Sequence, residues 1–105
     1  MDAFDLSDIE RQRREAGELY QEFLRVPSMS AGLYVLEAGA EDPQSPHQQD
    51  EIYYVVSGRA TITVAGEDRR VEPGSVVFVA AAVEHRFHSI DERLELLVLF
   101  APAET

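Results

Sequence analysis

Residues 39–58 decide the fold of this chain, and they read GAEDPQSPHQQDEIYYVVSG. The first half, rich in Pro, Gln and acidic residues, predicts a loop, whereas the β-branched and aromatic run Ile52–Val56 predicts a strand. Side chains two positions apart on a strand point to the same side, so His47 and Glu51 are expected to converge on one point. The residues predicted to share this face are His47, Gln49, Glu51, Tyr53 and Val55.

Outward from this stretch, from Tyr20 onward, short apolar runs alternate with turn residues. The predicted strands include residues 33–36, 52–56, 60–64, 76–79 and 94–100, and the predicted turns include Asp42-Pro43, Ser57-Gly58, Ala65–Asp68 and Glu72–Gly74. Many short strands with regular turns are typical of an all-β sandwich or barrel. We therefore predict an all-β fold over about residues 20–102.

A short helix is predicted in the N-terminal extension, which covers about residues 1–18. Ser7 and Glu10 match a capping box, which predicts a helix over 7–16 that Gly17 ends. The arginines of this helix are interleaved with glutamates, so we expect them on a solvated face with helical ion pairs. At 105 residues, the chain is expected to form one domain, residues 1–105.

Charge and composition exclude several classes of function. Nine Arg and Lys against twenty Asp and Glu give a net charge of −11, which disfavours nucleic acid and anionic membrane surfaces as partners. The absence of Cys excludes disulfides and thiolate metal sites, so a metal would need His or oxygen ligands. The acidic start and the lack of a long apolar run predict a cytoplasmic protein.

The three histidines supply the candidate chemistry. Strand periodicity places His85 with Phe87 and Ser89 on one face and His88 on the other. His47, Glu51 and His85 together would form a two-His, one-carboxylate site for a divalent transition metal. On spacing alone, a surface hydrogen bond between His47 and Glu51 is the more common arrangement.

The glycine spacing brings a family resemblance. The order is Gly39, five residues, Ser45, one residue, His47, three residues, Glu51, six residues and Gly58, which resembles the first signature of the cupin superfamily. In the second signature Gly74 and His85 match by identity, whereas Ala80, Ala82 and Ser89 replace its Pro, Gly and Asn. The resemblance covers about residues 33–101 and is to small single-domain bacterial cupins with a conserved barrel.

This resemblance implies a double-stranded β-helix, or jelly-roll barrel, with a metal inside. It implies that His47, Glu51 and His85 are ligands of Fe, Mn, Ni, Zn or Co. Ser45 stands where a further histidine ligand is expected, so water or a substrate oxygen could take that position. Gln49 lies between the two ligands of the first signature and is expected beside them, able to bond bound water or reach the metal.

The pocket around such a site is expected to be mostly apolar. Its predicted lining comes from Tyr53, Val55, Phe87, Phe78, Ile62 and Phe100, for which core packing is the more common role. Tyr53 is the exception, because its buried hydroxyl needs a partner and would face the site. Tyr54 is expected on the opposite side, where it could pack between subunits.

Two functions remain open at this stage. One is a metal-dependent dioxygenase or isomerase/cyclase acting on a small, partly apolar oxygenated compound. The other is a non-catalytic module that binds a small molecule in the same barrel. A homodimer is also expected, because the strand predicted at 20–26 carries apolar Phe23 and Leu24 that could lie across a second subunit.

Overall fold

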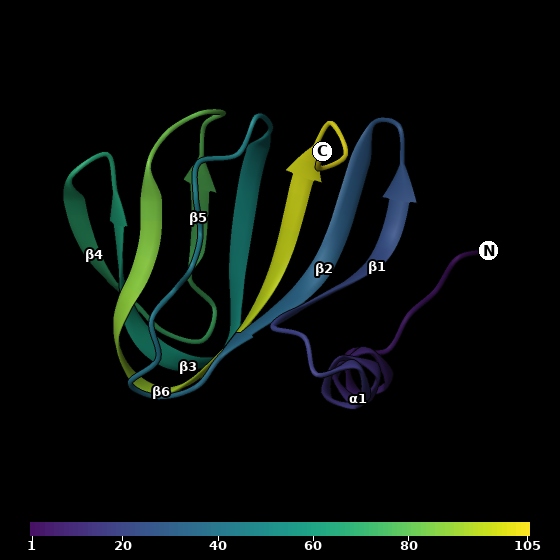
Figure 1. The fold of residues 1–105 in the computed structure, drawn as a ribbon, viewed down its shortest axis with the longest axis horizontal. Coiled ribbons are helices and arrows are strands. Elements are labelled where there is room, and N and C mark those ends of the chain that lie inside the picture. The colour runs from purple at the N-terminus through teal and green to yellow at the C-terminus, as the bar shows by residue number, and fades with distance from the viewer.

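A computed structural model describes residues 1–105 and contains one helix and six strands (Figure 1). The elements in chain order are α1 (Leu6–Ala16), β1 (Tyr20–Val26), β2 (Met29–Leu36), β3 (Asp50–Val64), β4 (Glu67–Val71), β5 (Val76–Val79) and β6 (His85–Ala101). All strand pairs are antiparallel, which confirms the predicted all-β fold with one short helix.

The two long strands, β3 and β6, form the centre of the sheet. The strand order is β1-β2-β6-β3-β4, and β5 pairs with the first half of β3. β4 pairs with the second half of β3, so the two halves of this strand have different neighbours. The strands curve around a common interior, as Figure 1 shows.

Ser57-Gly58 is not a turn between two strands, as the sequence suggested, but a bend within β3. The β3–β6 register shifts at several points between Val55 and Thr61. Gly58 has a φ of 95°, and a Cβ on it would overlap the carbonyl oxygen of Arg93. Only glycine fits this close approach, and the irregular pairing lets the strand turn a barrel corner without ending.

The charged strand β4 is absent from the predicted strands. Of the predicted turn at 65–68, Ala65 and Gly66 form the turn, with φ of 50° and 80°, and pairing resumes at Glu67. Most of β4 is exposed. A strand with so little buried surface carries no alternating apolar pattern by which it could be recognised.

The prediction that Phe78 closes the barrel is wrong, since this ring is 59% exposed. Register explains the difference: Val77 pairs with the buried Tyr53, and Phe78 pairs with the outward Ile52. Ser89 is also misplaced, because its φ of 50° interrupts the alternation of β6. It is exposed and the next residue, Ile90, is buried instead.

The main core fills the interior between the curved halves of the sheet. It contains fourteen buried residues: Tyr34, Leu36, Tyr53, Val55, Ala60, Ile62, Val71, Val79, Phe87, Ile90, Leu94, Leu96, Val98 and Phe100. The predicted inward residues Tyr53, Val55, Ile62, Phe87 and Phe100 are all among them.

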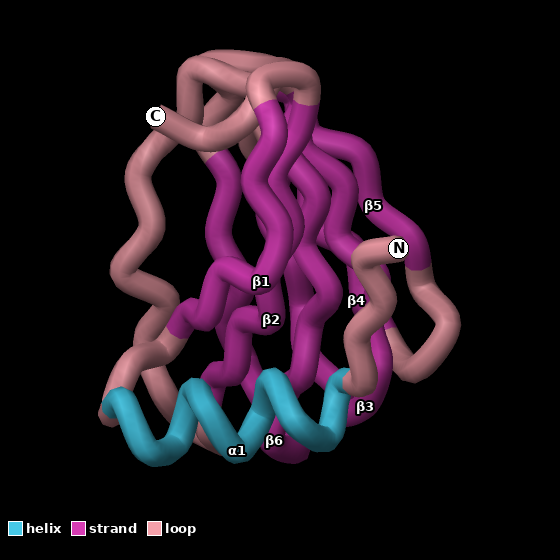
Figure 2. The backbone as a smooth tube through the Cα atoms, turned by 90° about the vertical axis from the view of Figure 1, so that its right-hand side faces the viewer, coloured by secondary structure: helices cyan, strands magenta, loops and turns pink.

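A second, smaller core lies under α1, which crosses the sheet beside β1 and β2 (Figure 2). Ile9 of the helix packs there on Leu33 and Val35. The predicted capping box is wrong: the helix begins at Leu6, after Asp5, and no side chain caps it. Gly17 ends the helix in the left-handed conformation, as expected.

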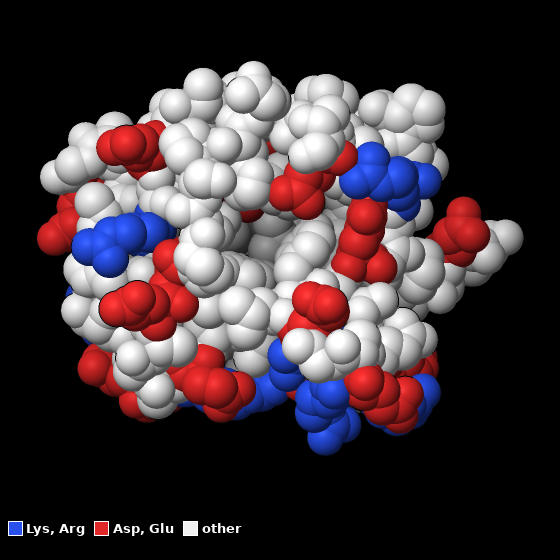
Figure 3. Space-filling model, viewed as in Figure 1, with Lys and Arg blue, Asp and Glu red and all other residues white.

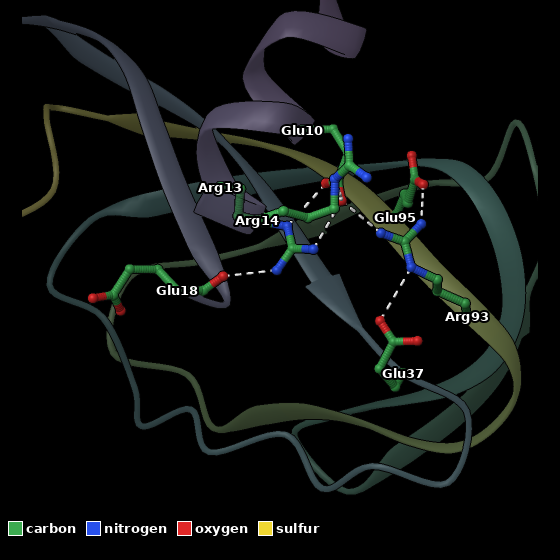
Figure 4. A network of polar contacts seen from close by, with 7 residues as sticks. All are labelled: Glu10, Arg13, Arg14, Glu18, Glu37, Arg93 and Glu95. Atoms are coloured by element: carbon green, nitrogen blue, oxygen red, sulfur yellow. Dashed lines mark hydrogen bonds and ion pairs between the residues drawn. The ribbon is translucent and has the colours of Figure 1, made fainter. Parts of the chain in front are cut away.

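Glu10 does not cap the helix but binds two arginines. Its carboxylate accepts hydrogen bonds from Arg13 at 2.8 and 2.9 Å and from Arg93 of β6 at 2.7 Å (Figure 4). Arg13 is 8% exposed and also donates to the carbonyl of Glu18, so it is not a solvated residue as predicted. This network holds α1 on the sheet.

No helix has the length and apolar character needed to span a membrane.

Candidate metal centre

Glu51, His85 and His47 come from three separate segments and meet inside the barrel. Glu51 pairs with Phe100 at one end of the β3–β6 ladder, and His85 pairs with Val64 at the other end. The bend in β3 brings these ends face to face, and the loop 37–49 adds His47. One candidate ligand atom from each of the three residues lies within 4.8 Å of the other two.

The buried part of this cluster has unsatisfied polar atoms. Both side chains, Glu51 and His85, are 1% exposed, and Glu51 Oε1 lies 3.1 Å from His85 Nε2. The two atoms form an ion pair when His85 is protonated, but neither oxygen of Glu51 nor Nε2 of His85 has an aligned hydrogen-bond partner. Since buried polar groups are normally paired, these atoms fit a cation that both would ligate.

The environment of His85 orients its ring for such a role. Nδ1 lies 2.9 Å from the carbonyl of Val83 and can donate to it, which leaves Nε2 to face Glu51. Burial disfavours the charged ring, but the Glu51 carboxylate and the Val83 carbonyl outweigh it and raise the pKa of His85. A backbone carbonyl on the second nitrogen is one of the common ways in which proteins fix a metal-binding imidazole.

His47 is held differently, because both of its ring nitrogens have a neighbour. Nδ1 lies 3.2 Å from Oε2 of Glu104, and Nε2 lies 3.2 Å from Oε1 of Gln44. The ring also meets Phe100 edge-on, with centroids 4.9 Å apart. The side chain is 21% exposed, so this ligand candidate sits at the solvent side of the cluster.

Gln44 occupies the region in which Ser45 was expected. Gln44 Oε1 accepts a hydrogen bond from the Tyr53 hydroxyl at 2.7 Å, and its Nε2 donates to Asp42 at 2.7 Å. Ser45 is exposed and lines none of the cavity. Side-chain direction in a loop has no fixed period, so the sequence does not show that Gln44 turns inward. The only indication is that Gln44 stands next to Ser45, the position at which a histidine was expected.

Asp42 fixes the loop that carries these residues. Its carboxylate accepts from the backbone N–H of Phe87 at 2.9 Å and from the hydroxyl of Tyr34 at 2.6 Å. Burial, followed by the Asp42 contact, raises the pKa of Tyr34 well above its ordinary value. The loop is thus tied to β6 and β2 at a single acidic residue.

A cavity of about 140 Å³ adjoins the cluster, and the space-filling view shows a hollow near the centre of one face with acidic side chains around it (Figure 3). The cavity is lined by Tyr20, Tyr34, Pro43, Gln44, His47, Glu51, Tyr53, Val98, Phe100 and Glu104. The Tyr20 hydroxyl is buried there without a hydrogen-bond partner. The cavity therefore offers one free donor in mostly apolar surroundings.

The remaining predicted positions lie around this cavity or outside it. Phe87 is buried in the core against Tyr53, with ring centroids 4.9 Å apart. Gln49 is buried, but its amide donates to Thr105 at 2.9 Å instead of turning toward the cluster. His88 contacts Thr63 at 2.8 Å, away from the cluster, as the strand period predicted.

Comparison with known proteins agrees with this architecture. Residues 32–100 match the family described as the Cupin domain. This chain is a cupin. The protein SCO3923 of Streptomyces coelicolor is 52% identical to it over 105 residues, which are all of both chains.

Solved structures give the same fold. The protein TT1209 from Thermus thermophilus matches with a TM-score of 0.79 and 25% identity over 98% of this cupin and 99% of that chain. The DMSP lyase DddQ from Ruegeria pomeroyi matches with a TM-score of 0.71 and 24% identity over 83% of this cupin and 49% of that chain. The architecture is the double-stranded β-helix of RmlC-like cupins, as the sequence predicted.

Proposed function

We propose that this cupin binds a divalent transition metal ion through His47, Glu51 and His85. The observation that carries the proposal is the buried Glu51 carboxylate, which has no hydrogen-bond partner on either oxygen and lies beside an unpartnered His85 Nε2. A bound ion of this class supplies Lewis acidity toward oxygen groups, and redox chemistry if it is iron or manganese.

The cavity beside the cluster favours a small, partly apolar ligand that carries oxygen. Val98, Phe100 and Pro43 provide apolar contacts, and the free hydroxyl of Tyr20 can donate to an acceptor on the ligand. The Glu51 and Glu104 carboxylates give the cavity negative charge, which disfavours polyanionic ligands. A volume of about 140 Å³ suits a compact molecule.

The catalytic form of this proposal is a dioxygenase or an isomerase/cyclase, and the second candidate is a binding module without catalysis. The lyase DddQ shows that one enzyme has this fold, and the three-residue protein ligand set leaves positions for a substrate oxygen. The replacement of the further histidine by the exposed Ser45 favours the binding module. Incubation of metal-loaded protein with small phenols, enols and keto acids, followed by mass spectrometry, separates a changed compound from one recovered intact.

The test of metal binding is elemental analysis of protein purified without chelators and without a metal-affinity column. We expect about one transition metal ion per chain. Protein that carries no metal and takes up none of Fe, Mn, Ni, Zn or Co on addition would refute the proposal.

We also propose a homodimer, with its contact on the outer face of β3 and β5. Four outward side chains form two apolar cross-strand pairs there, Ile52 with Phe78 and Tyr54 with Val76, and they are 38–60% exposed. Of the two residues that suggested a contact through β1, Phe23 packs within the chain against Phe4 at 5.0 Å, and Leu24 is half-buried. The proposed contact is therefore the β3–β5 face.

A second copy of the chain fits this face because the two cross-strand pairs carry no charge, whereas the whole chain has a net charge of −11. An apolar patch lets two acidic chains associate without bringing like charges into contact. Screening extends about 10 Å at 0.1 M salt, so raising salt should strengthen the dimer. Sedimentation of the wild-type chain at two salt concentrations is expected to show a dimer, and Phe78→Glu is expected to abolish that dimer. A wild-type monomer at both salt concentrations would refute the proposed dimer.

A further inference from the structure

The C-terminal segment, residues 102–105, turns back at the end of β6 and lies beside the β1–β2 hairpin (Figure 1). Its backbone is held at several points. The Glu104 N–H donates to Ser30 Oγ at 2.9 Å, and Arg25 donates to the Glu104 carbonyl at 2.7 Å. The N–H of Ala103 donates to the Pro27 carbonyl at 3.4 Å.

Two of the groups that hold this segment are buried polar side chains. Ser30 is 0% exposed and Gln49 is 4% exposed, and each makes a side-chain hydrogen bond to the segment. Burying a hydroxyl or an amide is costly unless it is hydrogen-bonded, so these residues depend on the segment for their partners. The segment is therefore part of the folded barrel and has a defined position.

This position places one carboxylate at the mouth of the cavity. Glu104 lines the cavity together with His47 and Glu51, and its Oε2 lies 3.2 Å from His47 Nδ1. The other nitrogen, Nε2, lies beside the Gln44 oxygen that also accepts from the Tyr53 hydroxyl. Both neighbours are acceptors, and a neutral ring can donate to only one of them. The Glu104 carboxylate, as the charged acceptor, favours the proton on Nδ1, which leaves the Nε2 lone pair facing the Gln44 oxygen.

We propose that Glu104 is the positioning residue of the metal ligand His47: the C-terminal segment carries a carboxylate that fixes the tautomer and the ring orientation of this loop histidine. This proposal rests on the proposed metal site. It adds to that site a residue of the C-terminal segment, Glu104. Ligating histidines commonly donate their second N–H to a carboxylate, and losing that partner costs about 10- to 100-fold in metal affinity.

The first experiment measures Co²⁺ binding to the full chain by its visible absorbance. Glu104→Ala is expected to bind about 10- to 100-fold more weakly than wild type. Glu104→Gln, whose amide oxygen can still accept from Nδ1–H, is expected to recover most of the affinity and the wild-type absorption spectrum. Asp68→Asn is the matched control, because Asp68 is a carboxylate 3.8 Å from His88, outside the cluster.

The second experiment observes the histidine itself in metal-free protein. Long-range ¹H–¹⁵N NMR is expected to show the His47 proton on Nδ1 in wild type and a mixture of tautomers in Glu104→Ala, with unchanged thermal unfolding. Wild-type Co²⁺ affinity in Glu104→Ala would overturn the proposal, as would a Glu104→Gln variant as weak as Glu104→Ala, which would identify a direct ligand. If wild type binds no Co²⁺ while the tautomer still depends on Glu104, the metal function fails and the positioning role stands.

Discussion

The two halves of the candidate metal centre are held in different ways. Glu51 and His85 project from the long strands β3 and β6, are 1% exposed, and present atoms that have no hydrogen-bond partner. His47 stands on the loop 37–49, is 21% exposed, and has a neighbour at each ring nitrogen. The strand half has no hydrogen-bond partner on these atoms, whereas the loop half has an oxygen atom beside each ring nitrogen.

This difference suggests a division of roles. A buried carboxylate without a partner raises the free energy of the metal-free fold, so the strand half gains most from a cation. The loop half must release the Gln44 oxygen from His47 before its Nε2 can ligate. We therefore expect the strands to determine whether metal binds and the loop to modulate how tightly.

The largest effect should come from removing one histidine from each half. His85→Ala and His47→Ala should both lose stoichiometric metal, and only His47→Ala should keep weak, rapidly exchanging binding, because its buried Glu51 and His85 remain. Elemental analysis after dialysis against a fixed metal concentration measures this. His88→Ala is the control and should retain all its metal; equal loss in all three variants would refute the assignment of ligands.

Lowering the pH should weaken binding next most strongly. The Glu51 carboxylate and Val83 carbonyl raise the pKa of His85 in spite of its burial, so its protonated form persists above the ordinary range near 6.5. Because a protonated imidazole cannot ligate, metal affinity should fall by about tenfold per pH unit as pH drops through the raised pKa of His85. Co²⁺ titrations from pH 8 to pH 4 measure the slope, and retention unchanged at pH 4 would count against imidazole ligation.

Glu51→Gln tests how much the buried Glu51 carboxylate destabilises the metal-free protein. At pH 9, with EDTA present, the wild-type carboxylate is buried without a hydrogen bond, and the neutral amide should raise the free energy of unfolding by about 1–3 kcal/mol. The same variant should lose metal, so stability and binding change in opposite directions. Urea unfolding measures the first effect, with the exposed Glu41→Gln as a control that should change little. A destabilised metal-free Glu51→Gln would show that the carboxylate is satisfied in some other way.

Much of the strand half could be predicted from the sequence. Strand periodicity put Glu51 on the inward face with Tyr53 and Val55, and the cupin-like spacing of Gly39, Gly58 and Gly74 linked it to His85. The same period was applied to His47, which lies on the loop before β3. The structure brings these three side chains together. Regular strands have a fixed period of two, so the direction of a side chain follows from its number in the chain.

The rest could not be predicted, because it depends on contacts between distant segments. Gln44 is directed by the hydrogen bonds of its loop, which have no period, and Glu104 reaches His47 only after the whole barrel has formed. Strand β4 is too exposed to show an apolar pattern, and the bend at Gly58 looks like a turn in the sequence alone. In each case the missing information is the position of a partner far along the chain.

The smallest effect should come from Gln44, the residue that joins the two halves. Its oxygen accepts from the Tyr53 hydroxyl, which is fully buried, and removing it in Gln44→Ala leaves that hydroxyl to turn toward the Glu51 carboxylate. A hydrogen bond to the carboxylate competes with a metal ion, so affinity for Co²⁺ should fall about 2- to 10-fold, the equivalent of one hydrogen bond. Adding Tyr53→Phe to Gln44→Ala removes the competing hydroxyl and should restore binding, whereas the exposed Gln48→Ala should have no effect. Tighter binding in Gln44→Ala would reverse this interpretation, because it would mean that the Gln44 oxygen acts mainly by holding His47 Nε2 away from the metal.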